Sequence, residues 1–540
     1  MDDPNSSLDY QIGQDNITPL GLDIHNPVFL ISGLSIVIFV LLTLMFQAES
    51  AAFFAWLRPT ITSTFDWFFL SAGNIFVIFA LVMCISPLGR VRLGGQDASP
   101  DYSYVGWFSM LFAAGMGIGL MFFGVSEPMS HFASSMGGIS LGENGLRTDW
   151  APLGGAAGDI NAAKDLAMAA TIYHWGLHPW SMYAVVALAL AFFSYNHKLP
   201  LTLRSAFYPL LGERVWGWPG HLIDIIAVFA TLFGLATSLG FGTQQALAGF
   251  NYLYDWGTGS AAVVVLITVI TAIAIGSVVR GLDGGVKLLS EVNMILALVL
   301  LAFIFLVGPT SDIITTLFSG AAAYITQFIP LSMPFGREDA NFSQGWTSFY
   351  WAWWISWSPF VGMFIARVSR GRTVREFLIC VILVPTVLCI LWMATFGGTA
   401  LTQVIADASA PVAAAAQEIK LFHMLAEFPL SNFLSLIGII LVLVFFVTSS
   451  DSGSLVIDTI TAGGKINAPV SQRVFWCCFE GLVAAVLLLV GGAEALGALQ
   501  AMAVSTGLPF TIVLLLMCVS LWMGLSRASK AINLESVTVK

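Results

Sequence analysis

The densest aromatic stretch of the chain lies at residues 346–359. Five of the 17 tryptophans fall within twelve positions there, inside an apolar run long enough to cross a bilayer. At helical spacing its side chains form two neighbouring stripes, one with Trp346, Tyr350, Trp353 and Trp357 and one with Trp351, Trp354 and Ser358. Desolvated indole faces attract quaternary ammonium groups. A membrane-interface belt is the alternative, but this density, with interspersed serines and a closing proline, favours a cage for a cation.

A second aromatic group lies at residues 172–183. Helical spacing places three rings in one sector of this segment: Trp175, Trp180 and Tyr183. They can complete the cage, and Pro179 is expected to kink the helix and aim the rings. His174 and His178 have the i, i+4 spacing of metal ligands, but no acidic or third ligand stands nearby in the sequence. Hydrogen-bonded packing is therefore the favoured interpretation.

Two further segments place polar backbone or side chains in apolar runs. Three alternating glycines in 112–122 weaken a helix there, and unwound backbone at membrane depth is tolerated only where it lines a cavity. Such a break exposes amides for a carboxylate and carbonyls for Na+, while close helix packing through Gly115 and Gly119 is an equally weighted alternative. In 445–454, hydroxyls and Asp451 favour ion binding over hydroxyl bonds to the helix backbone.

The composition requires a membrane protein. The 540 residues are 57% hydrophobic and 10% charged, with a mean hydropathy of +0.86. Nucleic acid is excluded as a partner because the few basic residues lie between spans instead of forming a basic surface. An enzyme is excluded because the apolar spans contain no nucleophile–base or metal constellation. A channel would carry a repeated filter or rings of one charge, which the asymmetric tryptophan clusters do not provide.

Hydropathy predicts an all-α polytopic fold with twelve transmembrane helices. The expected spans are 29–47, 67–87, 103–124, 166–195, 221–251, 259–279, 286–308, 343–366, 374–396, 431–461, 473–492 and 497–523. Between them, 311–334 is expected to lie along the membrane surface and 123–164 to form an outer loop. Sixteen of the 21 Lys and Arg residues fall on one side of this topology. That side is cytoplasmic by the positive-inside rule, so both termini should be cytoplasmic.

The motifs AAGMGIGLMFFGVSEP and WTSFYWAWWISWSPFVGMFIARVSRGRTVREF resemble the betaine/choline/carnitine transporter family over essentially the whole chain. The resemblance implies two inverted five-helix repeats of the LeuT type, preceded by two additional helices. It also implies a homotrimer, surrounded by lipid in a bacterial inner membrane. The expected segments are an N-terminal tail (1–28), the two additional spans (29–102), the first repeat (103–308), a surface helix and linker (309–342), the second repeat (343–523) and a C-terminal tail (524–540).

The resemblance also carries site residues over to this chain. The family's aromatic box matches Trp175, Trp180, Tyr183 and Trp354, with Trp357 lining the pathway beside it. The substrate carboxylate would face Met116, Gly117 and Ile118, with Ser238. One sodium site matches Ala113, Met116, Phe445, Thr448 and Ser449. A second keeps Thr231 and Phe360 but has Leu235 where sodium-coupled members place a threonine.

These matches predict a symporter that imports a methylated-onium zwitterion, glycine betaine or dimethylsulfoniopropionate, coupled to Na+ and without a cofactor. The alternative is a choline or carnitine carrier driven by H+ or by exchange. Choline brings no carboxylate, and choline-transporting relatives resemble one another in placing an aspartate at the position of Gly119. The glycine in this chain therefore predicts a preference for zwitterions.

Overall fold

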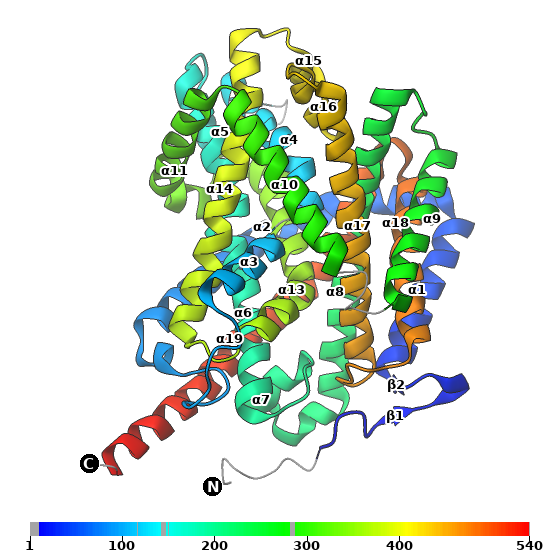
Figure 1. The fold of residues 1–540 in the computed structure, drawn as a ribbon, viewed down its shortest axis with the longest axis vertical. Coiled ribbons are helices and arrows are strands. Elements are labelled where there is room, and N and C mark those ends of the chain that lie inside the picture. Colours follow the sequence, from blue (N-terminus) through cyan, green and yellow to red (C-terminus); the bar gives the residue numbers. More distant parts are fainter. Residues whose placement is uncertain (1–9, 116, 142–146, 149–150, 281–286, 539–540) are drawn as a thin grey trace.

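The computed structural model describes residues 10–115, 117–141, 147–148, 151–280 and 287–538. Within these residues the chain is a bundle of long helices with one short hairpin (Figure 1). Ten helices are long and apolar enough to cross a membrane, or up to eleven if one bent pair counts as a single span. The protein is therefore an all-α, multi-pass membrane protein, as the composition predicts.

The first half of the chain contains strands β1 (Asn16–Ile17) and β2 (Ile24–His25) and helices α1 (Val28–Met45), α2 (Gln47–Ile85), α3 (Tyr104–Gly115), α4 (Ile118–Gly137), α5 (Ile160–Trp175), α6 (Leu177–His197), α7 (Tyr208–Leu211), α8 (Trp218–Tyr254) and α9 (Ser260–Arg280). The second half contains α10 (Lys287–Val307), α11 (Thr310–Ser332), α12 (Ala340–Phe342), α13 (Ser348–Val368), α14 (Val374–Ala406), α15 (Pro411–Ala414), α16 (Lys420–Ala426), α17 (Ser431–Thr461), α18 (Val470–Gly491) and α19 (Ala495–Thr538).

The twelve predicted spans map onto these helices, although their number stays a prediction. The tryptophan-rich helix α13 is not among the ten apolar helices, whereas α11, the expected surface helix, is among them. Helices α18 and α19 satisfy the length and hydropathy test as one stretch, Val470–Ile532. Indole, hydroxyl and proline side chains lower the mean hydropathy of α13. Its position inside the bundle is therefore explained by packing against neighbouring helices, and not by its own hydropathy.

Two of the predicted spans are broken. Helices α3 and α4 meet at an angle of 63°, and Gly117 between them has an extended backbone. This break confirms the unwound glycine segment. Helices α5 and α6 are separated at Gly176, three residues before Pro179. Pro179 has no N–H group to donate to the carbonyl four residues earlier. The break that it causes therefore lies about one turn before the proline, at Gly176, and not at the proline itself.

Helix α4 continues through the segment expected to be an outer loop. It extends to Gly137, and the prediction that a loop begins at Phe123 is therefore wrong. Pro128 lies inside this helix and packs against the backbone of Gly397 in α14, where a Cβ atom would lie 2.5 Å from the proline ring. The Gly, Ser and Asp content of 123–164 predicts a loop, whereas in α4 Gly124 allows close packing against Trp392 of α14.

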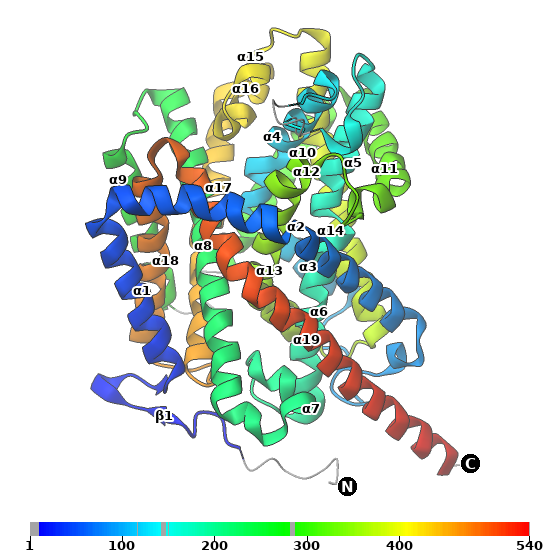
Figure 2. The same cartoon turned by 180° about the vertical axis from the view of Figure 1, so that it is seen from behind.

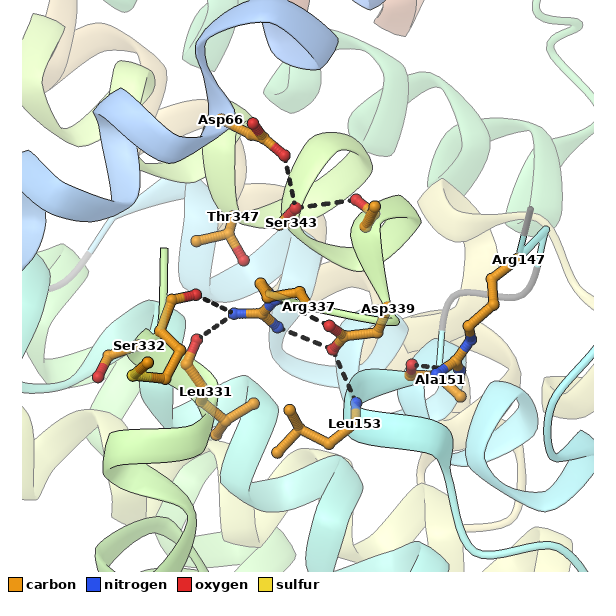
Figure 3. Close-up of polar contacts among 12 residues, drawn as sticks. Asp66, Arg147, Ala151, Leu153, Leu331, Ser332, Arg337, Asp339, Ser343 and Thr347 are labelled. Carbon is orange, nitrogen blue, oxygen red and sulfur yellow. Dashed lines mark hydrogen bonds and ion pairs between the residues drawn. The ribbon is translucent and has the colours of Figure 1, made fainter. Parts of the chain in front are cut away.

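The linker before α13 is fixed by one buried ion pair, shown in Figure 3. Arg337 donates to both carboxylate oxygens of Asp339, at 2.8 and 2.7 Å, and to the carbonyl of Leu331 at 2.6 Å. Asp339 in turn accepts the backbone N–H of Leu153 at 2.7 Å. The π-helical turn Ser343–Thr347 follows and leads directly into α13. These contacts set where the tryptophan-rich helix begins.

The N-terminal hairpin β1–β2 packs on the loop between α17 and α18. The Asn16 side chain donates to the Ala462 carbonyl at 2.9 Å, and Lys465 Nζ donates to Asp23 Oδ2 at 2.5 Å. Next to them, Arg204 Nη1 lies 3.0 Å from His25 Nε2. Figures 1 and 2 show this hairpin at the same end of the bundle as the C-terminal end of α19.

Candidate functional site

A small cavity at the break between α3 and α4 brings most of the predicted substrate residues together. Its volume is about 40 Å³, which is room for only a few water molecules. The wall is built from Ala114, Gly115, Gly117, Ile118, Gly119, Leu120, Trp175, Tyr183, Ser238, Trp353, Trp354 and Trp357. Six helices (α3, α4, α5, α6, α8 and α13) and the break between two of them therefore meet at this point.

One side of the cavity is aromatic and centres on Trp354 of α13. Its ring centroid lies 5.3 Å from that of Trp175, 6.0 Å from Trp180 and 5.0 Å from Tyr183. The first contact is edge-to-face, at 80°. Trp180 does not line the cavity, but it packs behind Trp354 and is fully buried. The rings therefore touch one another, and a methylated cation can enter only when they move apart.

The N-terminus of α4 forms another part of the wall. The first amides of a helix have no partner within the helix and carry the positive end of its dipole. Gly117, Ile118 and Gly119 line the cavity at this end, while Met116 lies outside the described residues. A Cβ atom at Gly119 would lie 2.7 Å from Trp175 Cη2 and 2.8 Å from Trp353 Cη2. Only glycine therefore lets these two indoles approach the helix end.

Ser238 and Trp357 complete the wall. The indole N–H of Trp353 donates to Ser238 Oγ at 3.1 Å, and the indole N–H of Trp357 donates to the Gly234 carbonyl at 2.8 Å. Both acceptors are on α8. The indole nitrogens of Trp180 and Trp354 have no hydrogen-bond partner among the described residues. Helix α8 thus fixes two indole planes of α13 at the cavity edge.

A buried carboxylate that the sequence analysis did not identify lies behind this aromatic wall. Glu127 of α4 is fully buried. Its Oε1 atom lies 2.6 Å from His174 Nδ1 and 3.2 Å from His131 Nε2. Its Oε2 atom accepts the indole N–H of Trp175 at 2.7 Å and the Tyr350 hydroxyl at 2.5 Å. Glu127 therefore orients one ring of the cavity wall directly.

The three groups Glu127, His131 and His174 have atoms within 4.8 Å of one another, as metal ligands would. However, His174 and Glu127 are already in direct hydrogen-bond contact, and His174 Nε2 lies 3.0 Å from the Thr347 hydroxyl. His178, the other histidine of the predicted pair, bonds Asn74 at 3.0 Å instead. His174 and His178 thus have the hydrogen-bond partners that the packing interpretation predicts. The acidic and third ligands missing from the nearby sequence are nevertheless present in space beside His174, as Glu127 and His131.

The remaining tryptophans of the segment 346–359, Trp351 of α13 and Trp346 of the turn before it, face other partners. Trp351 stacks on His178 at 5.4 Å and meets Tyr173 edge-on at 5.0 Å, so it packs against α5 and α6. Trp346 contacts the His131 ring at 4.7 Å. The two stripes seen in the sequence thus do not separate by function. The cavity takes Trp353 and Trp354 from different stripes, because adjacent residues both border a cavity at the helix break.

The predicted sodium residues lie on α3, α8 and α17. The Thr448 hydroxyl donates to the Val444 and Phe445 carbonyls of its own helix, at 3.0 and 3.3 Å. Ser449 is buried, and Ala113 lies on the last turn of α3. Phe445 lies one turn before Ser449 on α17. Two hydroxyls and the carbonyl at the α3 end are the hard oxygen atoms that a Na+ ion would need.

The second predicted sodium site has a leucine, Leu235, at the position where the family resemblance predicts a threonine hydroxyl. The Thr231 hydroxyl donates to the Ala227 carbonyl at 2.7 Å. Leu235, one turn later, is fully buried and fills the space above Gly453 of α17, where a Cβ atom would overlap its side chain. An isobutyl group here supplies packing and no ligand.

A second cavity, of about 360 Å³, lies beside the aromatic rings, on the side away from the two chain termini. The termini are the ends predicted to be cytoplasmic. The cavity is bordered by Phe123, Trp346 and Phe349. Phe123 and Phe349 both contact the Trp353 ring, at 6.0 and 5.6 Å. Helix α16, drawn in gold near the top of Figure 1, lies near this end. A single layer of rings therefore separates this cavity from the small aromatic one.

Comparison with known proteins agrees with this geometry. Residues 27–530 match the model of the BCCT, betaine/carnitine/choline family transporter. A glycine betaine/proline/choline transporter of Vibrio parahaemolyticus is 65% identical over 521 residues, covering 96% of this chain and 94% of that protein. Glycine betaine transporter 1 of the same organism is 55% identical, with coverage of 96% and 97%. A glycine betaine transporter of Acinetobacter baylyi is 43% identical, with coverage of 86% and 67%. The chain therefore belongs to the betaine/carnitine/choline transporter family, and it is a transporter and not an enzyme.

Proposed function

We propose that this protein imports glycine betaine or a closely related onium zwitterion through the cavity at the α3–α4 break. One observation carries the proposal: the same cavity is lined by indole and phenol rings and by the N-terminus of α4. Aromatic faces hold the methylated cation, and unpaired helix amides hold the carboxylate. Dimethylsulfoniopropionate has the same two groups and fits the same description.

We further propose that transport is Na+ symport by alternating access, with Thr448 and Ser449 as side-chain ligands. Phe445, Ala113 and Met116 would contribute backbone carbonyls. Because Leu235 removes a ligand from the second site, the expected stoichiometry is fewer than two Na+ ions per substrate.

Choline is the second candidate substrate, because the Vibrio relative with 65% identity is named a glycine betaine/proline/choline transporter. The cavity wall offers choline no carboxylate, because Gly119 occupies the position next to Trp175 and Trp353. Glu127 is the acidic group behind the wall, and both of its oxygens are occupied by hydrogen-bond donors. We therefore expect betaine to be transported better than choline.

The orientation in the membrane is part of the same proposal. Figure 2 shows the N-terminal hairpin and the end of α19 at one end of the bundle. Sixteen of the 21 Lys and Arg residues fall on the side of the termini in the predicted topology, which supports cytoplasmic termini. We also propose the bacterial inner membrane as the location, a homotrimer as the assembly, and the two five-helix repeats at 103–308 and 343–523 as the moving parts.

Uptake into proteoliposomes tests the substrate and the ion together. Labelled betaine, dimethylsulfoniopropionate, choline and carnitine are offered with an inward Na+ gradient, with an inward H+ gradient, and with neither. The proposal expects Na+-driven uptake of the two zwitterions and weaker uptake of choline. Uptake of choline equal to betaine would contradict the preference for zwitterions, and uptake driven only by H+ would contradict the coupling ion.

A further inference from the structure

A second group of acidic and hydroxyl side chains lies within the bundle, away from the aromatic cavity. Glu480 is at the middle of α18 and Asp451 is on α17, and both are almost completely buried. Ser450 Oγ donates to Glu480 Oε2 at 2.9 Å, and Ser277 Oγ on α9 donates to Asp451 Oδ2 at 2.5 Å. Three helices therefore bring two carboxylates and two hydroxyls to one place.

The Glu480 carboxylate is incompletely paired. Among the described residues, its Oε1 atom has no hydrogen-bond partner although it is shielded from solvent. Nearby on α9, the buried hydroxyl of Thr271 also has no partner and lies against Gly481, where a Cβ atom would overlap it. The only hydrogen bond to Glu480 within the described ranges comes from a neutral hydroxyl.

No described basic side chain forms an ion pair with Glu480. The titratable groups that interact with it are Asp451 on α17 and Cys477 and Cys478 on its own helix. Arg473 acts on Asp451 and pairs with Asp458 at 3.7 Å. Two ionised carboxylates without a cation are costly at membrane depth. Charge balance therefore requires that Glu480 carry a proton or a bound cation.

The geometry favours the proton. A hard cation is bound by several oxygen atoms arranged around it, whereas here the hydroxyls bond the carboxylates directly. We propose that Glu480 is a proton-binding site between α9, α17 and α18, and that its protonation sets the affinity of the adjacent Thr448–Ser449 turn for the coupling cation. The second half of this proposal rests on Na+ coupling, while the first half does not.

The chain connects the two sites directly. Ser450, the donor to Glu480, follows Ser449 in α17. Loss of the proton places a negative charge on the carboxylate that is hydrogen-bonded to Ser450, the residue next to the proposed cation ligand Ser449. This charge attracts Na+, so the Na+ concentration for half-maximal uptake is expected to fall by about tenfold as the pH rises through the titration of Glu480.

Infrared difference spectroscopy of the purified protein in lipid tests the proton site independently of transport. The wild type should show the C=O stretch of a buried carboxylic acid that disappears at high pH. Glu480→Gln should remove this band, and Ser450→Ala should move it to higher frequency because the acid loses a hydrogen bond. Glu427→Gln is the matched control, because Glu427 is exposed, and it should leave the band unchanged. A band that persists in Glu480→Gln would overturn the proton site.

The second experiment measures half-saturating Na+ for betaine uptake across the same pH range. Wild type and Glu427→Gln should show the decrease with pH, and Glu480→Gln should show one constant value. If Glu480→Gln retains the pH dependence, the link between the two sites is wrong. If the wild type needs no Na+ at any pH, the proposed coupling fails, and the infrared band still decides the proton site.

Discussion

Replacing Glu127 with glutamine should weaken substrate binding although Glu127 does not line the cavity. The carboxylate faces four donors, from His174 at 2.6 Å, His131 at 3.2 Å, Trp175 at 2.7 Å and Tyr350 at 2.5 Å. A glutamine side chain offers one acceptor oxygen and two donor hydrogens. The single amide oxygen can accept from only one pair of donors, either the two histidines or Trp175 and Tyr350. The amide N–H groups then face the donors of the other pair, which lose their acceptor.

The size of the effect follows from this count. Each buried donor left without a partner costs about 1–3 kcal/mol. The structure relieves part of this cost by turning the Trp175 ring away from Glu127, and this moves the ring that meets Trp354 at 5.3 Å. We expect a loss of about 1.4–2.8 kcal/mol in betaine binding, or roughly tenfold to a hundredfold in Kd.

Isothermal titration calorimetry in detergent measures this loss, with Glu427→Gln as the control for an exposed glutamate. Trp175→Phe keeps an aromatic ring but has no N–H group to donate to Glu127. If Glu127 acts through Trp175, the double variant should lose less affinity than the sum of the two single variants. Normal betaine affinity in Glu127→Gln, or fully additive losses, would refute the positioning role.

Four further outcomes are expected. Trp354→Ala should cost about 2 kcal/mol of betaine binding, roughly thirtyfold, and Trp354→Phe should keep part of it; normal binding by the alanine variant would exclude an aromatic box. Thr448→Ala should raise the Na+ needed for half-maximal uptake more than it changes betaine affinity at saturating Na+, and unchanged Na+ dependence would remove Thr448 from the ion site. Gly119→Ala should weaken betaine binding by about 1–3 kcal/mol, because the added methyl group would lie 2.7 Å from an indole carbon; calorimetry showing equal affinity would contradict this packing. Burial and the adjacent Arg204 lower the pKa of His25 from 6.5 to about 3, so the neutral ring stabilises the fold fully above pH 6.5 and progressively less as the pH falls towards 3. The thermal midpoint should fall over that range less in His25→Asn than in the wild type, and equal slopes would exclude His25 as the source.

The aromatic wall and the broken helix could be predicted because their signals are local. The tryptophan spacing in 346–359 and the glycines in 112–122 depend on residues a few positions apart. Hydropathy likewise locates most helices. The predicted span 343–366 also contains a helix, α13 (Ser348–Val368), although its tryptophans and serines keep it out of the ten most apolar helices.

The Glu127 cluster could not be predicted from these signals. Its partners come from α5 and α13, and the contact to Tyr350 joins residues 223 positions apart. The Gly, Ser and Asp content of 123–164 also predicts a loop there, although the part around Glu127 is a buried helix. One local signal was available: Glu127 and His131 stand at i, i+4 and share one helix face. This spacing brings two side chains together only in a helix, so it predicts no contact in a segment that is expected to be a loop.

The docked N-terminal hairpin has a consequence for how the chain is made. Asn16 leaves the ribosome long before its partner, because the carbonyl it binds belongs to Ala462, 446 residues later. At about 5–20 residues per second, this partner is synthesised roughly 20 to 90 s afterwards. The hairpin therefore stays undocked, without its partners near Ala462, while most of the helices are inserted. Its docking marks a chain that has been completed through α18, and a product truncated before α17 would expose Asn16 and Asp23 to water.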